Sequence, residues 1–499
     1  MTESAPFLID NDDVPALRDA VSQIVRIGYC ETQVRRRLGL TDISDLYWRS
    51  LPIYRRERLS QRDALATAID LFLLQGTISQ QELSGLFCRT DQEVLIRAGI
   101  LSIDGQGCAC ARASLFPVSD HLAFSEHAWP MLPHPGLSNV PHNQVMSVGA
   151  DSHWLARATV RRPVDSALDL CTGSGIHALL AATHSQRVLA VDINPRAVAC
   201  THFNTQVLGI TNVEAVVGDL FDSVGEERFD LITANPPFVP SPINTVGFRD
   251  GGHSGEDIQR RIVTSLPHHL APGGIVQMVT ELGERDGESL EDRLRTWIGN
   301  APIDIHILRL REYSTTNYAL GHAVGEDYAT FLDSVDAWSR NLKDQGYNRI
   351  IAVLLAFQWS DATCGPPWTW SGVSEPPLYD DAGIEIEEIF ATERLARHPH
   401  FHKILERGRI RRTMRIKLFE AGMLGDESLI QTHAQLLGKA LAIQQWLNPI
   451  ERELLVRLER ALALSDILSL AEDLGLERET TLATLRSLLQ RRLISLCSN

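Results

Sequence analysis

The most constraining stretch of this 499-residue chain is Asn235-Pro236-Pro237-Phe238, which directly follows an apolar run. The run, residues 229–234, has the length and composition of a buried strand. Two consecutive prolines end that strand, because neither can donate to a sheet ladder. An asparagine side chain and free main-chain carbonyls are therefore left at a strand's carboxyl end, where open α/β sheets bind ligands.

A glycine-rich turn precedes this stretch by about sixty residues and follows another predicted strand. It reads Asp169-Leu170-Cys171-Thr172-Gly173-Ser174-Gly175. Glycines at a strand-to-helix turn let a ligand approach the backbone and expose the N–H groups of the helix start. Alone, the turn suits a dinucleotide equally well, with Asp192 on a ribose in either case. Gly218-Asp219-Leu220 closes the next predicted strand.

Together these residues resemble the class I S-adenosylmethionine-dependent N-methyltransferases of the N-P-P-[YF] type. That group includes protein glutamine methyltransferases and enzymes that methylate adenine or guanine amino groups of RNA and DNA. The resemblance covers about residues 145–359 and neither end of the chain. It implies that the cofactor S-adenosyl-L-methionine is held by residues at the strand ends: Asp169, Cys171, Thr172, Gly173, Ser174, Gly175, Asp192, Ile193, Gly218, Asp219, Leu220 and Asn235.

Within this set, the resemblance implies distinct roles. The turn surrounds the methionine part of the cofactor, Asp192 accepts hydrogen bonds from the ribose hydroxyls, and Asp219 holds the adenine amino group. The chain departs from the family at Cys171, where a glycine is usual, which leaves the shape of the turn open. An unrelated ligand on a Rossmann-like domain is the plainer alternative.

The N-P-P-F motif has a chemical rationale. An amide or an aromatic amine has a delocalised lone pair and attacks a sulfonium poorly. The Asn235 side-chain oxygen and the Pro236 carbonyl can bind its two N–H groups and turn the lone pair towards the methyl carbon, while Phe238 stacks on a planar substrate. Positioning then supplies most of the rate, and no strong general base is required. The competing interpretation of Pro236 and Pro237 is a turn after a core strand.

Two neighbouring segments are weaker candidates. The glycine-rich segment 247–255 resembles the loop beside the substrate pocket in the same family, and offers Arg249 and His253 as substrate contacts; four glycines explain it as a turn equally well. Asp151-Ser152, just before the first strand, is interpreted as a plain helix start, and a contact with the cofactor is the alternative.

The length of the chain predicts three domains. Residues 141–360 alternate strand and helix, which predicts an α/β, Rossmann-like domain with a parallel sheet covered on both faces. Its seven strands are expected at residues 167–171, 188–192, 213–217, 230–234, 275–280, 303–310 and 350–357. Residues 313–347 form an insertion before the last strand, with helical spacing in their second half.

Mainly helical domains are expected at both ends. In residues 1–140, helices near 14–27, 62–74, 80–87 and 93–98 precede a hairpin across Asp104-Gly105, which predicts a winged-helix-like module for substrate recognition. A helical cap without a binding role is the equal alternative. A proline-rich linker is expected at 129–140. In residues 361–499, an irregular connection, a helix over 428–446 and three helices after Pro449 predict a second winged-helix-like unit.

Composition narrows the function. The net charge of −16 argues against a protein whose whole surface binds nucleic acid. Basic residues nevertheless cluster in residues 35–62 and 394–417. No secretory signal or apolar run of spanning length is seen, and the eight cysteines lack metal-site spacing. These features predict a cytoplasmic protein with reduced thiols and no metal.

Three functions remain open. The slightly favoured one is methylation of an amino group on an RNA base, because phenylalanine stands at the last motif position. Methylation of a glutamine-like amide in a protein or peptide is the alternative, which the acidity of the chain favours. A non-catalytic regulator that binds the cofactor belongs to another class. The partner is a macromolecule in the first two cases, and no membrane partner is expected.

Overall fold

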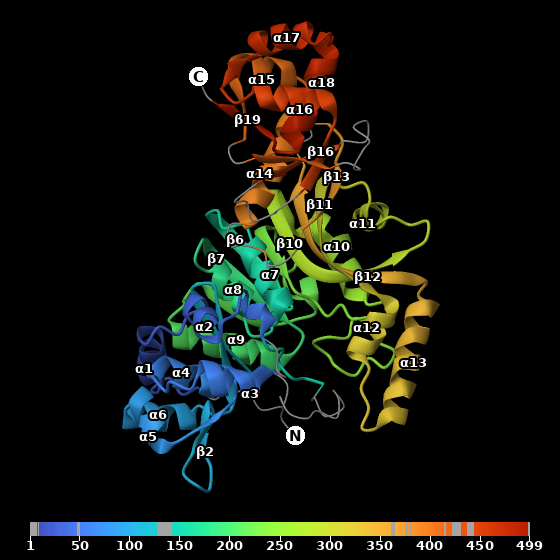
Figure 1. Ribbon diagram of the computed structural model, residues 1–499. Helices are drawn as coiled ribbons and strands as arrows, with labels where there is room; N and C mark the ends of the chain where they lie inside the picture. Colours follow the sequence, from blue (N-terminus) through green and yellow to red (C-terminus); the bar gives the residue numbers. More distant parts are fainter. Residues whose placement is uncertain are drawn as a thin grey trace.

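The computed structural model describes residues 7, 9–46, 50–126, 142–360, 365–374, 378, 382–413, 416–421, 431–436 and 444–497. At its centre lies an eight-stranded sheet in the order β13-β11-β12-β10-β9-β6-β7-β8 (Figure 1). The strands are β6 (Val164–Leu170), β7 (Ser185–Asp192), β8 (Val213–Val217), β9 (Phe229–Ala234), β10 (Leu270–Arg285), β11 (Ile303–Ser314), β12 (Tyr347–Trp359) and β13 (Thr369–Val373). All seven predicted strands are present, and the α/β, Rossmann-like class is confirmed.

Two features of this sheet differ from the prediction. β12 runs antiparallel to both β10 and β11, so the sheet is mixed rather than fully parallel. β13 pairs parallel with β11 at the edge of the sheet, inside the segment predicted to be irregular. The Trp370 ring stacks on the buried imidazole of His306 with centroids 4.7 Å apart. This aromatic contact secures a short strand that the prolines around it obscure in the sequence.

Helices cover both faces of the sheet, as predicted. α7 (Ala150–Ala158), α8 (Ile176–Ala181) and α14 (Ala382–Arg397) pack on one face, and α10 (Asp257–His269) and α11 (Leu290–Ile298) pack on the other. α9 (Pro195–Leu208) follows β7. The insertion before β12 forms α12 (Thr315–His322) and α13 (Tyr328–Asp344), which lie beside the motif loop. The carboxyl ends of β6 to β9 therefore open into a cleft whose lining includes Ser152 of α7 and both Ile258 and Arg261 of α10.

The N-terminal part shares one continuous core with the central domain. Its helices are α1 (Val14–Arg26), α2 (Glu31–Leu38), η1 (Ile43–Asp45), α3 (Leu51–Ile53), η3 (Tyr54–Arg58), α4 (Ala64–Ala68), η4 (Ile69–Leu73), α5 (Gln80–Leu86) and α6 (Arg89–Arg97). Its strands are β1 (Thr77–Ile78), β2 (Leu101–Ile103), β3 (Ala109–Ala111), β4 (Ala113–Val118) and β5 (His121–Glu126). The Phe124 ring of β5 meets the Phe203 ring of α9 edge-on at 5.7 Å, so this part is fused to the cofactor side of the sheet.

The sequence prediction for this part holds only in outline. The hairpin across Asp104-Gly105 pairs β2 with β3, whereas residues 113–118 pair with β5 in a second hairpin. β1 joins the first hairpin to give the order β1-β3-β2. Asp13 stands at the start of α1, but its carboxylate pairs with Arg97 of α6 instead of capping the helix. The predicted linker at 129–140 lies outside the described residues, and the winged-helix assignment stays a prediction.

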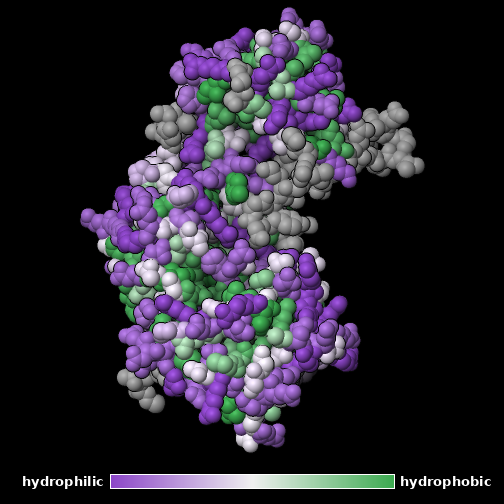
Figure 2. Space-filling model, turned by 90° about the vertical axis from the view of Figure 1, so that its left-hand side faces the viewer, coloured by the Kyte–Doolittle hydropathy of each residue, from purple (hydrophilic) through white to green (hydrophobic). Residues whose placement is uncertain are grey.

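The C-terminal part forms a lobe beyond the sheet edge (Figures 1 and 2). α15 (Phe401–Arg407), β14 (Arg409–Arg412), α16 (Pro449–Arg457), β18 (Leu462–Ala463), α17 (Leu464–Asp473), α18 (Arg478–Gln490) and β19 (Ile494–Cys497) surround a separate core. β15 (Ile416–Ala421), β16 (Gln431–Leu436) and β17 (Gln444–Leu447) form a small sheet, so the helix predicted over 428–446 is wrong. α14 packs against both α7 and α18 and thereby joins the two units.

In the described part of the chain, every helix is too short or too polar to span a membrane.

Candidate active site

The glycine-rich turn lies between β6 and α8 and has three residues in the left-handed backbone region. Cys171, Gly173 and Gly175 have φ values of 56°, 56° and 83°. A Cβ on Gly175 would stand 2.7 Å from the Thr201 side chain, so close packing on α9 requires glycine there. Cys171 adopts the conformation that a glycine adopts without strain. The departure from the family at this position therefore changes the residue and keeps the turn.

Asp192 ends β7 and faces the turn. Its Oδ2 accepts a hydrogen bond from the Gly173 N–H and its Oδ1 accepts one from the Asn194 N–H, each 2.9 Å long. Burial raises the pKa of this carboxyl, and the two backbone donors oppose that rise. Each carboxylate oxygen can accept a further hydrogen bond, so Asp192 keeps acceptor capacity for two neighbouring hydroxyl groups.

The third strand end completes this side of the cleft. Asp219 follows β8, and its carboxylate forms an ion pair of 2.9 Å with Arg261 of α10. Leu220 has a φ of 53°, which folds the chain sharply after the strand. Gly218 allows that fold, because a Cβ there would stand 2.2 Å from the Ser223 hydroxyl. Ile193 is mostly exposed and borders the same space.

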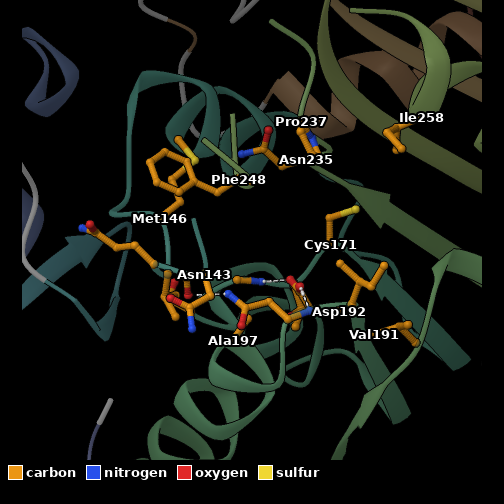
Figure 3. Close-up of a pocket in the computed structure, with 18 of the residues that line it drawn as sticks. Asn143, Met146, Cys171, Val191, Asp192, Ala197, Asn235, Pro237, Phe248 and Ile258 are labelled. Atoms are coloured by element: carbon orange, nitrogen blue, oxygen red, sulfur yellow. Dashed lines mark hydrogen bonds between the residues drawn. The ribbon is translucent and has the colours of Figure 1, made fainter. Parts of the chain in front are cut away.

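A cavity of about 610 Å³ connects these strand ends to the N-P-P-F motif. Figure 3 shows Asn235 and Pro237 on one wall and Asp192 on the opposite wall, with Cys171 between them. The predicted residues that line it are Cys171, Thr172, Gly173, Ser174, Asp192, Ile193, Gly218, Asp219, Leu220, Asn235 and Pro237. Pockets of this size are typical of cofactor and small-ligand sites.

Four predicted site residues have another position. Among the described residues that line the cavity, Asp169, Gly175, Pro236 and Phe238 do not appear. The Asp169 carboxyl is buried and accepts hydrogen bonds from the Thr172 hydroxyl at 2.6 Å and the Thr233 hydroxyl at 2.8 Å. Burial raises its pKa to about 7. Asp169 therefore joins the glycine-rich turn to β9 from below the cavity surface, and does not directly face the space for the methionine part.

Phe238 also differs from its predicted role. Its side chain packs against a cluster that includes Val239, Tyr318 and Trp338, the last two from the insertion helices. The Tyr318 hydroxyl donates to the Glu281 carboxyl at 2.5 Å. Burial raises the pKa of Glu281 to about 7. Phe238 is partly exposed and packs against the insertion, so it anchors the motif loop and is not fully open for a stacked base.

The loop after the motif contributes different residues from those predicted. Phe248 and Asp250 line the cavity, and Figure 3 shows Phe248 beside Met146 near Asn235. Arg249 pairs with Asp250 at 2.6 Å and lies over the Trp338 ring. His253 contacts the Asn341 side chain at 3.3 Å. Both predicted substrate contacts are thus used to pack the loop against α13.

A segment that sequence reasoning missed forms another wall. Residues 142–148 line the cavity, and three contacts fix them. The His142 ring bonds the Thr245 carbonyl at 3.0 Å, the Asn194 amide donates to the Asn143 carbonyl at 2.7 Å, and the Val145 N–H donates to the Glu126 carboxylate at 2.6 Å. The segment has no helix or strand periodicity, so nothing in the sequence pattern marked it.

Asn235 has partners outside the motif. Its Nδ2 group donates to Asp151 Oδ2 at 2.9 Å and lies 3.3 Å from Ser152 Oγ, both in the first turn of α7. The sequence marked Asp151-Ser152 only as a helix start, with a cofactor contact as the alternative. Burial raises the pKa of Asp151, and the Asn235 amide opposes that rise.

The sequence model of the family described as "Methyltransferase small domain" matches residues 147–298. A ribosomal protein uL3 glutamine methyltransferase of Bradyrhizobium diazoefficiens is 39% identical over 26% of this chain and 43% of its own length. A release factor glutamine methyltransferase of Geobacter sulfurreducens is 31% identical over 30% of this chain and 58% of its own.

A third relative, from Methanocaldococcus jannaschii, carries the name of a protein N5-glutamine methyltransferase. It is 30% identical over 28% of this chain and 73% of its own length. The chain spans about half the length of the first two relatives. From the match to the third, and from the strand-end residues around the cavity, the chain belongs to the methyltransferase small-domain family of S-adenosylmethionine-dependent class I methyltransferases.

Proposed function

We propose that this protein transfers a methyl group from S-adenosylmethionine to the side-chain amide nitrogen of a glutamine in a protein substrate. The observation that carries the proposal is that Asn235 lines the same cavity as the three cofactor strand ends. The three relatives described above carry names of protein glutamine methyltransferases, which supports an amide as the acceptor.

The residues present fit the cofactor. Asp192 has acceptor capacity for a ribose diol, and the left-handed turn from Cys171 to Gly175 leaves room for a ligand against the backbone. Asp219 and Ile193 border the space available for a base. When bound, S-adenosylmethionine supplies a methyl group on a cationic sulfur, and its transfer leaves S-adenosylhomocysteine and one proton.

The protein's own contribution is positioning. Asn235 accepts a hydrogen bond from the acceptor nitrogen and holds that nitrogen between the N-P-P-F motif and the strand ends that hold the cofactor. Met146 and Phe248 give the cavity an apolar wall near Asn235 (Figure 3). An amide needs such help because its lone pair is delocalised into the carbonyl. Orientation and a dry, polar environment account for most of the expected acceleration.

Two observations weigh against the RNA base that the sequence slightly favoured. Phe238 packs into the insertion, so the stacking argument for a nucleobase loses its basis. α6 occupies the place in the chain order where a winged helix has its nucleic-acid-reading helix, yet it packs against α1 and its Arg97 pairs with Asp13. We propose that the winged-helix-like ends select a protein surface. A non-catalytic regulator would need no ordered acceptor at Asn235.

The test uses tritiated S-adenosylmethionine and a lysate of cells that lack this protein. The label is measured after protease or RNase treatment of separate portions. The proposal expects acid-insoluble label that protease removes and RNase leaves, and no label with Asn235→Ala. Label removed by RNase would instead establish an RNA substrate. Cofactor binding without any transfer would return the hypothesis of a regulator.

A further inference from the structure

The amide of Asn235 is held by two residues that belong to neither the glycine-rich turn nor the N-P-P-F motif. Asp151 and Ser152 lie in the first turn of α7, more than eighty positions before Asn235. Nδ2 of Asn235 approaches Asp151 Oδ2 at 2.9 Å and Ser152 Oγ at 3.3 Å. The relative sequence positions of these groups give no hint that they meet.

The orientation of α7 is itself fixed. Arg157, in its last turn, is buried and donates to Glu31 Oε1 at 2.5 Å, to Asp42, and to the Leu378 carbonyl at 3.2 Å. Glu31 and Asp42 come from the N-terminal part, and residue 378 precedes α14. A buried arginine with ionic partners from separate segments resists rotation of the helix. The first turn of α7 therefore presents Asp151 and Ser152 at a defined position.

An asparagine amide has nearly equal lobes that differ only in hydrogen-bonding character. Its nitrogen only donates and its oxygen only accepts, and an ionised aspartate only accepts. With Nδ2 turned to Asp151, Oδ1 remains as the acceptor for a ligand. A half-turn of the amide would present N–H groups to the N–H groups of the acceptor nitrogen, and the two sets of donors would repel each other.

We propose that Asp151, assisted by Ser152, is the positioning residue that selects the acceptor orientation of Asn235 and so commits the site to a nitrogen that carries hydrogen. This inference rests on the proposed function, since it concerns the same acceptor slot. Asp151 need not touch the substrate. It acts through the Asn235 amide, and the first turn of α7 favours its negative charge.

A swap of the two side chains tests this directly. Asn235→Asp places two carboxylates face to face and should reduce tritium transfer at least about 100-fold. Combined with Asp151→Asn, the new amide donates to the new carboxylate, whose second oxygen again serves as the acceptor. The double variant should recover at least about tenfold over Asn235→Asp alone. Affinity for S-adenosylmethionine, measured by calorimetry, should stay within about threefold in all variants.

A matched control separates pairing from charge. Asp165→Asn makes the same charge change on an exposed residue at the other end of β6, and it should not rescue Asn235→Asp. A purely structural role for Asp151 predicts that the double variant is no better than Asn235→Asp, and that result would overturn the proposal. Rescue by Asp165→Asn would do the same.

The Tm of the wild type, of Asn235→Asp and of the double variant is also measured without any substrate. Asn235→Asp should lower the Tm, and adding Asp151→Asn should raise it again. Absence of that coupling overturns the pairing even if no acceptor is found. If the wild type labels RNA while the swap restores transfer, the glutamine function fails and the positioning role stands, so the two ideas fail separately.

Discussion

The two halves of the cleft are built in different ways. The cofactor half is local, because consecutive strand ends supply Asp192, Asp219 and the glycine-rich turn. The Asp192 carboxylate accepts hydrogen bonds from nearby backbone N–H groups. The acceptor half is assembled from distant segments. Asn235 depends on α7, and Phe238 depends on the insertion before β12. The cofactor half is therefore built mainly from local motifs, whereas the acceptor slot depends on contacts with distant segments.

The largest effect is expected from Asn235→Ala. It removes the acceptor while leaving the cofactor half intact, so turnover should fall at least about 100-fold, which corresponds to roughly 3 kcal/mol. The Kd for S-adenosylmethionine, measured by calorimetry, should stay within about threefold of the wild-type value. Asn348→Ala, which changes an exposed asparagine at the start of β12, is the control. Equal loss of turnover and cofactor affinity would erase the distinction between the halves.

A buried residue beneath the turn limits how local the cofactor half is. Asn204 of α9 donates to the Ser174 and Phe124 carbonyls, each at 2.8 Å, and accepts from the Phe124 N–H at 2.9 Å. Asn204→Leu removes these three hydrogen bonds, leaves only the Cys200 thiol at 3.3 Å on the Phe124 carbonyl, and should lower the free energy of unfolding by roughly 2–3 kcal/mol. Denaturant titration measures this loss. His202→Ala, on the exposed face of α9, should change it little. Equal stabilities would show that β5 does not support the turn.

A smaller effect is expected when Asp192 is changed. Asp192→Ala removes two hydrogen bonds to backbone N–H groups together with the acceptors for a ribose, so cofactor affinity should fall by roughly 1–3 kcal/mol. The turnover number at saturating cofactor should change far less than with Asn235→Ala. Calorimetry and steady-state kinetics on one preparation distinguish the two. A variant that binds the cofactor normally would show that Asp192 serves only the turn.

The smallest effect concerns pH. Burial raises the pKa of Glu281 to about 7, so the folded state binds more protons than the unfolded state between pH 4.5 and 7. The free energy of unfolding of the wild type therefore falls as pH rises through this window. Glu281→Gln should gain roughly 1–2 kcal/mol relative to the wild type between pH 5 and pH 8.

Thermal melts at the two pH values check this prediction. Glu214→Gln, which changes an exposed residue of β8, is the control and should show no pH-dependent gain. A gain of Glu281→Gln that is the same at pH 5 and pH 8 would mean that the acceptor half does not bury a protonated carboxyl.

The limits of sequence prediction follow the same division. The seven strands, and most of the residues that line the cavity at the strand ends, were predictable because strand periodicity and glycine turns are local properties. Asp169 was assigned to the cofactor, but Thr172 and Thr233 enclose its carboxyl. Phe238 was assigned to the substrate, but it packs against the cluster that contains Tyr318 and Trp338. The pairing of Asp151 with Asn235 has no local signal, because it depends on how α7 packs. The strands Gln431–Leu436 and Gln444–Leu447 were predicted as part of one helix, because their sequence pattern does not separate the two structures.

The central claim is that the acceptor is a glutamine amide in a protein. The most direct measurement labels the proteins of a strain lacking this chain with methyl-tritiated S-adenosylmethionine and the purified protein, followed by acid hydrolysis. Acid cleaves an N-methyl amide, so a glutamine acceptor should give tritiated methylamine, which is volatile once the hydrolysate is made alkaline and is absent when Asn235→Ala replaces the wild type. Label that stays on a non-volatile amino acid, or that nuclease removes before hydrolysis, would contradict it.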